Sequence, residues 1–361
     1  MSSDGLIAGW AWDSDHPERR VTVEILADGK LLAQVTAEQY REDLRRQKIG
    51  DGAHAFSYAP PSPIDPEKQR IFAIVAGAGF LLQRTRAPNH TPFARPPLNW
   101  EPMAVELDAD ADTLAAIHQH INVTWSALGA SEPHWSVLTH PEFKHEAFTQ
   151  HSDRFHETGR QNIEDFVAVL RRSGIELSHD QTCLELGCGV GRLTAWLAPL
   201  FARVTATDIS ATHLQIAKAN IAGRGIKNVS FHQLCSLQDI NNFGRFDVFF
   251  SVIVFQHNPP PIIAYMLKVI LTQLSPGGVG YFQIPTYAKG YEFGTATYLS
   301  HIKQGNHMEM HVLPQYKVIE LVYETGCKLL EIREDGWTGI VDGISNTFLV
   351  MKDRRDPTAR R

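Results

Sequence analysis

Segments with strand-like and helical spacing of apolar residues alternate along the second half of the chain. Runs such as TCLELG at 182–187 and RVTATD at 203–208 are each followed by apolar residues every three or four positions. The run RFDVFFSVIVF at 245–255 is almost continuously apolar, as is typical of a parallel strand buried on both faces. This alternation predicts an α/β fold with a doubly wound parallel sheet, modified at its end by the strands KLLEIRE and NTFLVMK.

The first part of the chain has a different pattern. Short runs rich in β-branched and aromatic residues, separated by turn residues, predict an N-terminal β-sandwich. A segment with five prolines follows at 87–103, and proline sustains neither a helix nor a central strand. The predicted organisation is a β-sandwich domain at 1–86, a proline-rich linker at 87–103, a helical cap or lid at 104–160, an α/β domain at 161–353 and a basic tail at 354–361.

Composition narrows the class of protein. With 361 residues and 43% hydrophobic content, the chain has enough apolar material for two globular domains. A net charge of −6 argues against a general nucleic-acid binder, which needs a basic face. The four cysteines form no CxxC pair, and the start MSSDGLIAGW has no signal-peptide pattern, so we expect a cytoplasmic protein. Its apolar runs fall short of the ~20 residues of a membrane span, so we expect no integral membrane association.

Three glycines stand where a predicted strand turns into a helix, in the sequence CLELGCGVGR at 183–192. Gly187, Gly189 and Gly191 provide backbone that takes positive φ and allows a ligand to approach closely. Asp208 follows at the end of the next predicted strand, where an acid is placed to accept hydrogen bonds from ribose hydroxyls. The pattern predicts a nucleoside-binding site.

Glu185 distinguishes this turn from the dinucleotide motif. The glycine spacing is G-x-G-x-G instead of G-x-G-x-x-G, and an acid just before the turn would repel a pyrophosphate. An ammonium group would be attracted there. The residues therefore favour a zwitterionic nucleoside, although an NAD-dependent oxidoreductase or epimerase stays open as an alternative.

At these motifs the chain resembles the class I S-adenosylmethionine-dependent methyltransferases. LELGCGVGR resembles their first motif, TDIS their ribose-binding acid, FDVFFSVIVFQH their fourth-strand motif, and LSPGGVGYFQIP the helix–turn–strand that follows. The resemblance covers residues 160–352 and implies a Rossmann-like seven-stranded methyltransferase sheet with S-adenosylmethionine as the cofactor.

The resemblance implies that Glu185 and the glycine backbone hold the methionine part, that Asp208 holds the ribose and that Ile209 packs on adenine. Many members carry an adenine-binding acid after the third strand, where this chain has Leu234-Cys235-Ser236, so Ser236 or backbone groups are expected to replace it. The expected cofactor-binding residues are Glu185, Gly187, Cys188, Gly189, Gly191, Asp208, Ile209, Ser236 and Gln256.

Two histidines are candidates for the chemistry. Methyl transfer needs a positioned acceptor and, for a hydroxyl, a base. His257 follows the fourth strand of the α/β region, where ligands of such sheets bind, and a histidine with a pKa near neutrality suits proton removal. His311 is expected near the same rim as a reserve base, with a structural role as the alternative for both. The histidines between 134 and 156 have no paired metal-ligand spacing, so no metal site is predicted.

The sequence therefore predicts a methyltransferase whose acceptor is an oxygen of a sugar or glycolipid precursor. The expected partners are a small-molecule or glycan acceptor, no nucleic acid, and a second copy of the chain in a homodimer. A protein that keeps the fold and binds the cofactor without catalysis is a further alternative. Trp125 and Trp135 either cover the cofactor or pack a helix onto the sheet.

Overall fold

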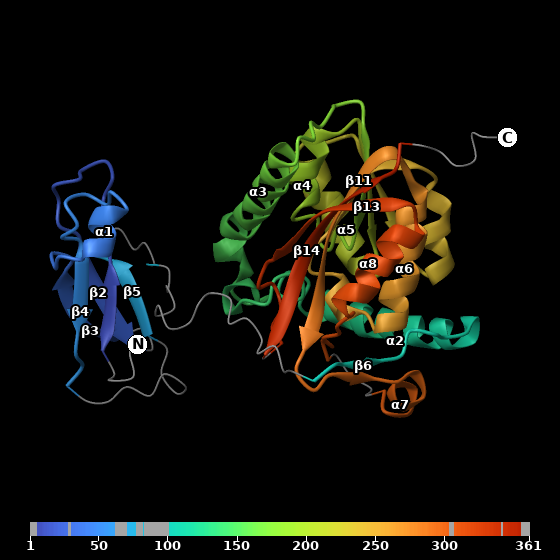
Figure 1. The fold of residues 1–361 in the computed structure, drawn as a ribbon, viewed down its shortest axis with the longest axis horizontal. Helices are drawn as coiled ribbons and strands as arrows, with labels where there is room; N and C mark the ends of the chain where they lie inside the picture. Colours follow the sequence, from blue (N-terminus) through green and yellow to red (C-terminus); the bar gives the residue numbers. More distant parts are fainter. Residues whose placement is uncertain are drawn as a thin grey trace. The chain divides into compact units, whose positions relative to one another are not determined.

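The computed structural model describes residues 6–27, 30–61, 71–76, 82, 101–302, 307–340 and 342–354. The chain divides into two compact units, Met1–Pro97 and Leu98–Arg361, which are drawn in Figure 1. Most of the predicted linker, and the basic tail beyond Arg354, lie outside the described residues. The domain boundaries assigned from the sequence therefore stay predictions.

The first unit is built from short antiparallel strands. β1 (Ile7–Trp10) pairs with β4 (Ala55–Tyr58), and β2 (Thr22–Ala27) lies between β3 (Lys30–Thr36) and β5 (Ile71–Val75). A short helix, α1 (Glu42–Arg46), stands in the predicted helical insert. Ile7, Val23, Ile25 and Phe56 share one apolar cluster, so strands of both sheets contribute to it. The β-rich character is confirmed for these residues, whereas the sandwich arrangement stays a prediction.

The described part of the second unit contains a seven-stranded sheet in the order β13-β14-β11-β10-β7-β8-β9. Neighbours from β9 to β11 run parallel, whereas β14 is antiparallel to both β11 and β13, which is the predicted modified end. The strands are β7 (Thr182–Leu186), β8 (Arg203–Asp208), β9 (Val229–Gln233), β10 (Phe246–Ser251), β11 (Leu274–Ala288), β13 (Cys327–Glu334) and β14 (Gly343–Lys352).

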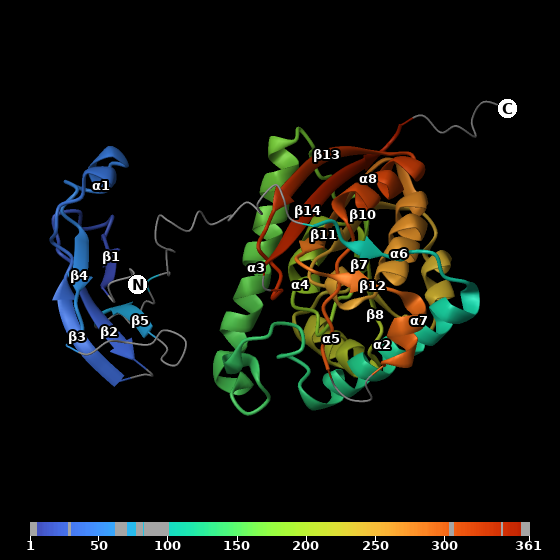
Figure 2. The ribbon, with the colours of Figure 1, turned by 60° about the horizontal axis from the view of Figure 1, so that its bottom comes forward.

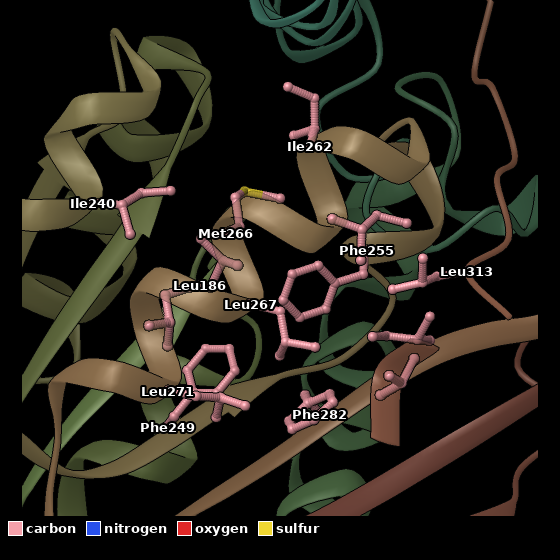
Figure 3. Packing of buried hydrophobic residues seen from close by; sticks show 14 of the residues in the cluster. Leu186, Ile240, Phe249, Phe255, Ile262, Met266, Leu267, Leu271, Phe282 and Leu313 are labelled. Carbon is pink, nitrogen blue, oxygen red and sulfur yellow. The ribbon is translucent and has the colours of Figure 1, made fainter. Parts of the chain in front are cut away.

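Consecutive strand residues enter different cores, because side chains alternate between the faces of a sheet. Cys183 and Phe250 belong to one apolar cluster, and their neighbours Leu184 and Phe249 belong to another. Figure 3 shows part of the second cluster, in which Phe249 and Phe282 of the sheet pack with Met266 and Leu271 of α6 (Pro260–Gln273). The continuous apolar runs of the sequence thus reflect burial on both faces.

Helices cover both faces of this sheet. In Figures 1 and 2, α3 and α4 lie on one face and α6 and α8 on the opposite face. The helices are α2 (Ala111–Ser131), η1 (Pro141–Phe143), α3 (Phe148–Arg172), α4 (Thr194–Leu197), η2 (Ala198–Leu200), α5 (Ala211–Gly223), η3 (Leu237–Phe243), η4 (Phe255–His257), α6 (Pro260–Gln273), α7 (Thr295–Ser300) and α8 (Gln315–Glu324). The predicted doubly wound, Rossmann-like sheet is confirmed.

The helical segment before the sheet is continuous with it. α3 runs through residue 160, the position at which the sequence predicts a change from the helical cap to the α/β domain, and that boundary stays a prediction. Ile117 and Ile121 of α2 join the apolar cluster of the sheet. Figure 1 places α2 and α7 at the end of the sheet where β11 ends, beside the short pair β6 (Ala104–Val105) and β12 (Glu292–Phe293).

Candidate functional site

The glycine turn after β7 has the backbone geometry that its sequence predicts. Gly187, Gly189 and Gly191 have φ values of +73°, +53° and +81°, which side chains disfavour. The amides of Gly187 and Cys188 both donate to the carbonyl oxygen of Thr207, at 2.8 Å each. These bonds tie the turn to the end of β8 and bring it next to Asp208.

Glu185 lies in β7 with its side chain buried and only half satisfied. The residue is 1% exposed, and its Oε2 accepts a hydrogen bond from Thr194 Oγ1 at 2.7 Å. Among the described residues, its Oε1 has no hydrogen-bond partner. Burial raises the pKa of Glu185 to about 7, although the hydroxyl of Thr194 and the charge of Arg192 oppose that rise.

Arg192 is a site residue that the sequence analysis missed. It lies at the end of the glycine turn, 3% exposed, and its Nη1 donates to Thr158 Oγ1 at 3.1 Å and Asn162 Oδ1 at 2.8 Å. Its Nε has no partner in the described part of the chain. Burial lowers the pKa of Arg192 to about 10, against the charge of Glu185. The arginine of CGVGR was the available signal, but only the fold shows it buried against α3.

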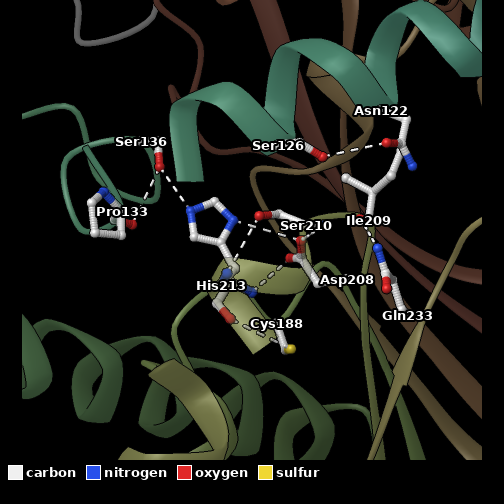
Figure 4. A network of polar contacts seen from close by, with 11 residues as sticks. Asn122, Ser126, Pro133, Ser136, Cys188, Asp208, Ile209, Ser210, His213 and Gln233 are labelled. Atoms are coloured by element: carbon white, nitrogen blue, oxygen red, sulfur yellow. Dashed lines mark hydrogen bonds and ion pairs between the residues drawn. The ribbon is translucent and has the colours of Figure 1, made fainter. Parts of the chain in front are cut away.

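Asp208 ends β8 with its carboxylate oriented by the backbone. Oδ2 accepts from the amide of Gly189 at 2.8 Å, and Oδ1 accepts from the amide of Ser210 at 2.9 Å. A carboxylate oxygen has two lone pairs and can accept two hydrogen bonds, so each oxygen of Asp208 can still accept a bond from a hydroxyl group. His213 Nδ1 lies 3.6 Å from Oδ1, as Figure 4 shows.

A cleft joins Arg192 and Asp208 to His257, whereas Glu185 and Gly191 are not on its described lining. Its free space, counted together with the part open to solvent, is about 650 Å³. Of the predicted cofactor-binding residues, its lining includes Gly187, Cys188, Gly189 and Asp208. Trp125 of α2 also lines it, with its ring centroid 5.0 Å from that of His257.

Other predicted cofactor-binding residues lie beside this cleft instead of on its lining. Ile209 packs against the apolar cluster of the sheet, and its carbonyl accepts a bond from Gln233. Ser236 caps η3 in a reciprocal capping box with Asp239, so its hydroxyl is engaged by the helix amide. A hydroxyl that accepts from an amide can still donate its own proton, so the role of Ser236 toward adenine stays a prediction.

His257 lines the cleft but differs from the expected base. Its Nδ1 lies 2.9 Å from the carbonyl oxygen of Glu309, which only accepts, so Nδ1 carries the proton. Nε2 then accepts from Gln256 Nε2 at 3.2 Å, and Gln256 Oε1 accepts from Gln283 at 3.1 Å. Burial lowers the pKa of His257 to about 4, whereas the sequence analysis expected a value near neutrality. Gln256 is buried behind His257 and orients it.

His311 belongs to a polar cluster behind His257. Its amide donates to the carbonyl of Gln256 at 2.7 Å, its Nδ1 lies 2.9 Å from Tyr291 Oη, and its Nε2 lies 3.0 Å from Glu309 Oε2. Glu309 also contacts Tyr298 and His120. Burial alone would raise the pKa of Glu309, but these donors lower it to about 2. His311 is absent from the described lining of the cleft.

Two further observations concern metal binding and membrane-spanning helices. Within the described ranges, no group of three or more histidines, cysteines and acids is arranged to hold a metal ion. None of the helices in those ranges is both long and apolar enough to cross a membrane.

The glycine turn lies within a segment that is similar to known proteins. Residues 183–278 match the family model described as a methyltransferase domain. A ubiquinone biosynthesis O-methyltransferase of Colwellia psychrerythraea is 30% identical over 105 residues, which are 29% of this chain and 42% of that protein. A tRNA/tmRNA (uracil-C(5))-methyltransferase of Aromatoleum aromaticum is 47% identical over 53 residues, 15% of this chain and 14% of that protein.

Among solved structures, the N-methyltransferase NodS of Bradyrhizobium japonicum, in complex with S-adenosyl-L-homocysteine, is similar at 17% identity. The match has a TM-score of 0.41 and covers 64% of this chain and 98% of that one. The chain spans less than half the length of the curated relatives described above. The predicted resemblance to methyltransferases is confirmed for residues 183–278.

Proposed function

We propose that this chain binds S-adenosylmethionine beside the glycine turn and transfers its methyl group to an acceptor. The observation that carries the proposal is the free, buried Oε1 of Glu185 at the start of that turn, within the segment that matches a methyltransferase domain. A buried carboxylate is costly unless a cation pairs with it. The ammonium group of a methionine moiety provides such a cation.

The neighbouring groups fit the rest of such a ligand. Nε of Arg192, which has no hydrogen-bond partner among the described residues, can donate to a carboxylate, and Asp208 can accept from ribose hydroxyls. Glu185 and Arg192 thus have the opposite charges to the two ends of an amino acid. S-adenosylmethionine supplies an electrophilic methyl group, and the protein has to exclude water and position the acceptor.

The acceptor proposed from the sequence is an oxygen of a sugar or glycolipid precursor. His257, Trp125 and Asn258 give the cleft wall both polar and aromatic surface, which suits a polyhydroxyl ligand. The relatives named above act on other acceptors by their names, so these are the first competitors to assay. A cytoplasmic location and a homodimer are further parts of this proposal.

Ligand binding to Asp208→Ala tests the proposed site. Hydrogen bonds to a charged group contribute ~1.5–3 kcal/mol each, so the affinity for S-adenosylhomocysteine should fall at least about tenfold in calorimetry. Glu320→Ala, which removes an exposed acid of α8, is the control. Unchanged binding in Asp208→Ala would refute the site. Preferential NAD binding would favour an oxidoreductase, and binding without product from any acceptor would indicate a non-catalytic protein.

His257 is proposed as the residue that receives the acceptor proton, on Nε2, which must exchange its hydrogen bond from Gln256 for one from the acceptor hydroxyl. With its pKa near 4 it is neutral at pH 7 but a weak base, so we expect His257→Ala to slow single-turnover methyl transfer by about 10²-fold, the lower end for such catalysis. Cofactor affinity should stay unchanged. His311→Ala serves as the comparison, because His311 lies behind this wall. A rate within about threefold of the parent, well under that range, would exclude His257 as the base.

A further inference from the structure

His213 of α5 is a buried residue of the cleft to which neither the sequence motifs nor the family match assigns a role. It is 1% exposed and lines the same cleft as Asp208. Its Nε2 lies 3.0 Å from Ser136 Oγ, and its Nδ1 faces Asp208 Oδ1 at 3.6 Å. Among the described residues, Nδ1 has no hydrogen-bond partner. Figure 4 shows the ring between Ser136 and Asp208.

The hydrogen-bonding groups around the His213 ring limit which of its two nitrogens carries the proton. The hydroxyl of Ser136 also lies 3.2 Å from the carbonyl oxygen of Pro133, which only accepts. If Ser136 donates to Pro133, it accepts a proton from Nε2 of His213. Nδ1 of a neutral ring then presents a lone pair beside the Asp208 carboxylate. A hydroxyl group placed between them would donate to either, which removes the unfavourable contact.

Ser136 and Val137 belong to the segment that packs on the glycine turn, which we call the covering segment. A Cβ built on Gly189 would stand 2.6 Å from Cγ2 of Val137, the residue after Ser136. A Cβ built on Gly129 of α2 would stand 2.3 Å from Ser210 Oγ and 3.3 Å from the His213 ring. The covering segment and α2 therefore pack directly on the turn and on His213, and they hold the imidazole in one orientation.

We propose that His213, oriented by Ser136, acts with Asp208 to recognise the vicinal hydroxyls of a nucleoside ligand. His213 is the hydroxyl-binding residue and Ser136 its positioning residue. The role rests on the proposed function, since it assumes an adenosyl ligand in this cleft. It adds a residue from outside the glycine motif and links the covering segment to ligand recognition.

The test measures how well variants of the full chain discriminate between S-adenosylhomocysteine and its 2′-deoxy and 3′-deoxy analogues. His213→Asn can place its amide oxygen, an acceptor, near the position of Nδ1, whereas His213→Gln places its amide group near the position of Nε2. We expect His213→Gln to bind S-adenosylhomocysteine about tenfold more weakly, from the loss of one such hydrogen bond, and to lose preference over one deoxy analogue. His213→Asn should retain that preference.

Ser136→Ala keeps the proposal testable if substitutions of the buried histidine unfold the protein. It should weaken S-adenosylhomocysteine binding about threefold to tenfold, with a smaller effect on the same deoxy analogue. Ser126→Ala is the matched control, because Ser126 is also a hydroxyl of the helical segment but bonds only to Asn122 in the described structure. The proposal would be overturned if these variants lost the same affinity for S-adenosylhomocysteine and for both deoxy analogues. It would also be overturned if His213→Gln and Ser136→Ala discriminated between these ligands as well as the parent does. Failure of the unsubstituted chain to bind S-adenosylhomocysteine would instead refute the proposed function.

Discussion

At the residue scale, the site is defined by buried charges that are not fully paired. Burial raises the pKa of Glu185 to about 7 and lowers that of Arg192 to about 10. Both shifts have the direction that desolvation imposes on an acid and a base. A structural ion pair would shift both values in the opposite directions. The two groups therefore have the electrostatic properties of a site that receives a zwitterion.

Glu185 should make ligand affinity depend on pH. Below pH 7 the free protein carries a protonated Glu185, and an ammonium ligand must displace that proton. We expect the affinity for S-adenosylhomocysteine to rise by about tenfold in all from pH 6 to pH 8, most steeply below the pKa of about 7. Calorimetry across this range measures it. Glu185→Gln should bind weakly and without this pH dependence, and a persistent slope in the variant would assign it to another group.

Glu185 should also lower the free energy of unfolding as the pH rises toward neutrality. The folded-state pKa of about 7 lies above the ordinary value of 4.5, so the folded protein binds more protons than the unfolded chain between these values. The free energy of unfolding therefore falls as the pH rises from about 4.5 through 7. Glu185→Gln removes this loss and should be more stable than the parent at pH 8, by about 1–3 kcal/mol. Thermal unfolding of the parent and of Glu185→Gln at pH 5 and pH 8 measures this gain in stability. An equal difference in stability between the two proteins at both pH values would contradict the raised pKa of Glu185.

At the scale of elements, the glycine turn and the segment around Val137 form one packed layer. Gly189 has two constraints, its φ of +53° and the side chain of Val137, which lies 2.6 Å from the point where a Cβ of residue 189 would stand. Gly225 has φ +71° with nothing within 4 Å of that point, so it reports the backbone cost alone.

Comparison of these two glycines separates backbone strain from packing. Gly225→Ala should cost about 1–2 kcal/mol in the free energy of unfolding, from the left-handed conformation. Gly189→Ala should cost more and also weaken S-adenosylhomocysteine binding, because Val137 must move. Val137→Ala in the Gly189→Ala background should restore only the packing part. If both glycine variants lose equal stability, the covering segment does not pack on the turn as described.

At the scale of the whole molecule, the two compact units differ in architecture. The residues proposed to bind the cofactor all lie in Leu98–Arg361, including Glu185, Arg192, Asp208 and His213. The described lining of the cleft comes from residues of Leu98–Arg361.

Removal of the first unit should therefore leave ligand binding intact. A chain that starts at Leu98 is expected to bind S-adenosylhomocysteine with an affinity within about twofold of the full chain, since it keeps every proposed contact. Calorimetry and thermal unfolding of both chains test this. If the shortened chain is unfolded where the full chain is folded, the two units share a core and the predicted linker is misplaced.

The sequence by itself determined the features that depend on local backbone and periodicity. The alternation of strands and helices, the positive φ at Gly187, Gly189 and Gly191, and the place of Asp208 at a strand end all follow from residue type and neighbours in the chain. The methyltransferase resemblance rests on the same short-range pattern, which is why it was recognisable.

Only the tertiary structure decided which side chains are desolvated together. Arg192 contacts α3, Ser136 reaches His213 across 77 positions of sequence, and Ser236 caps η3 instead of lining the cleft. The pKa of His257 depends in the same way on burial and on the carbonyl of Glu309. Burial and hydrogen-bond partners come from segments far apart in the chain, and no local pattern encodes them.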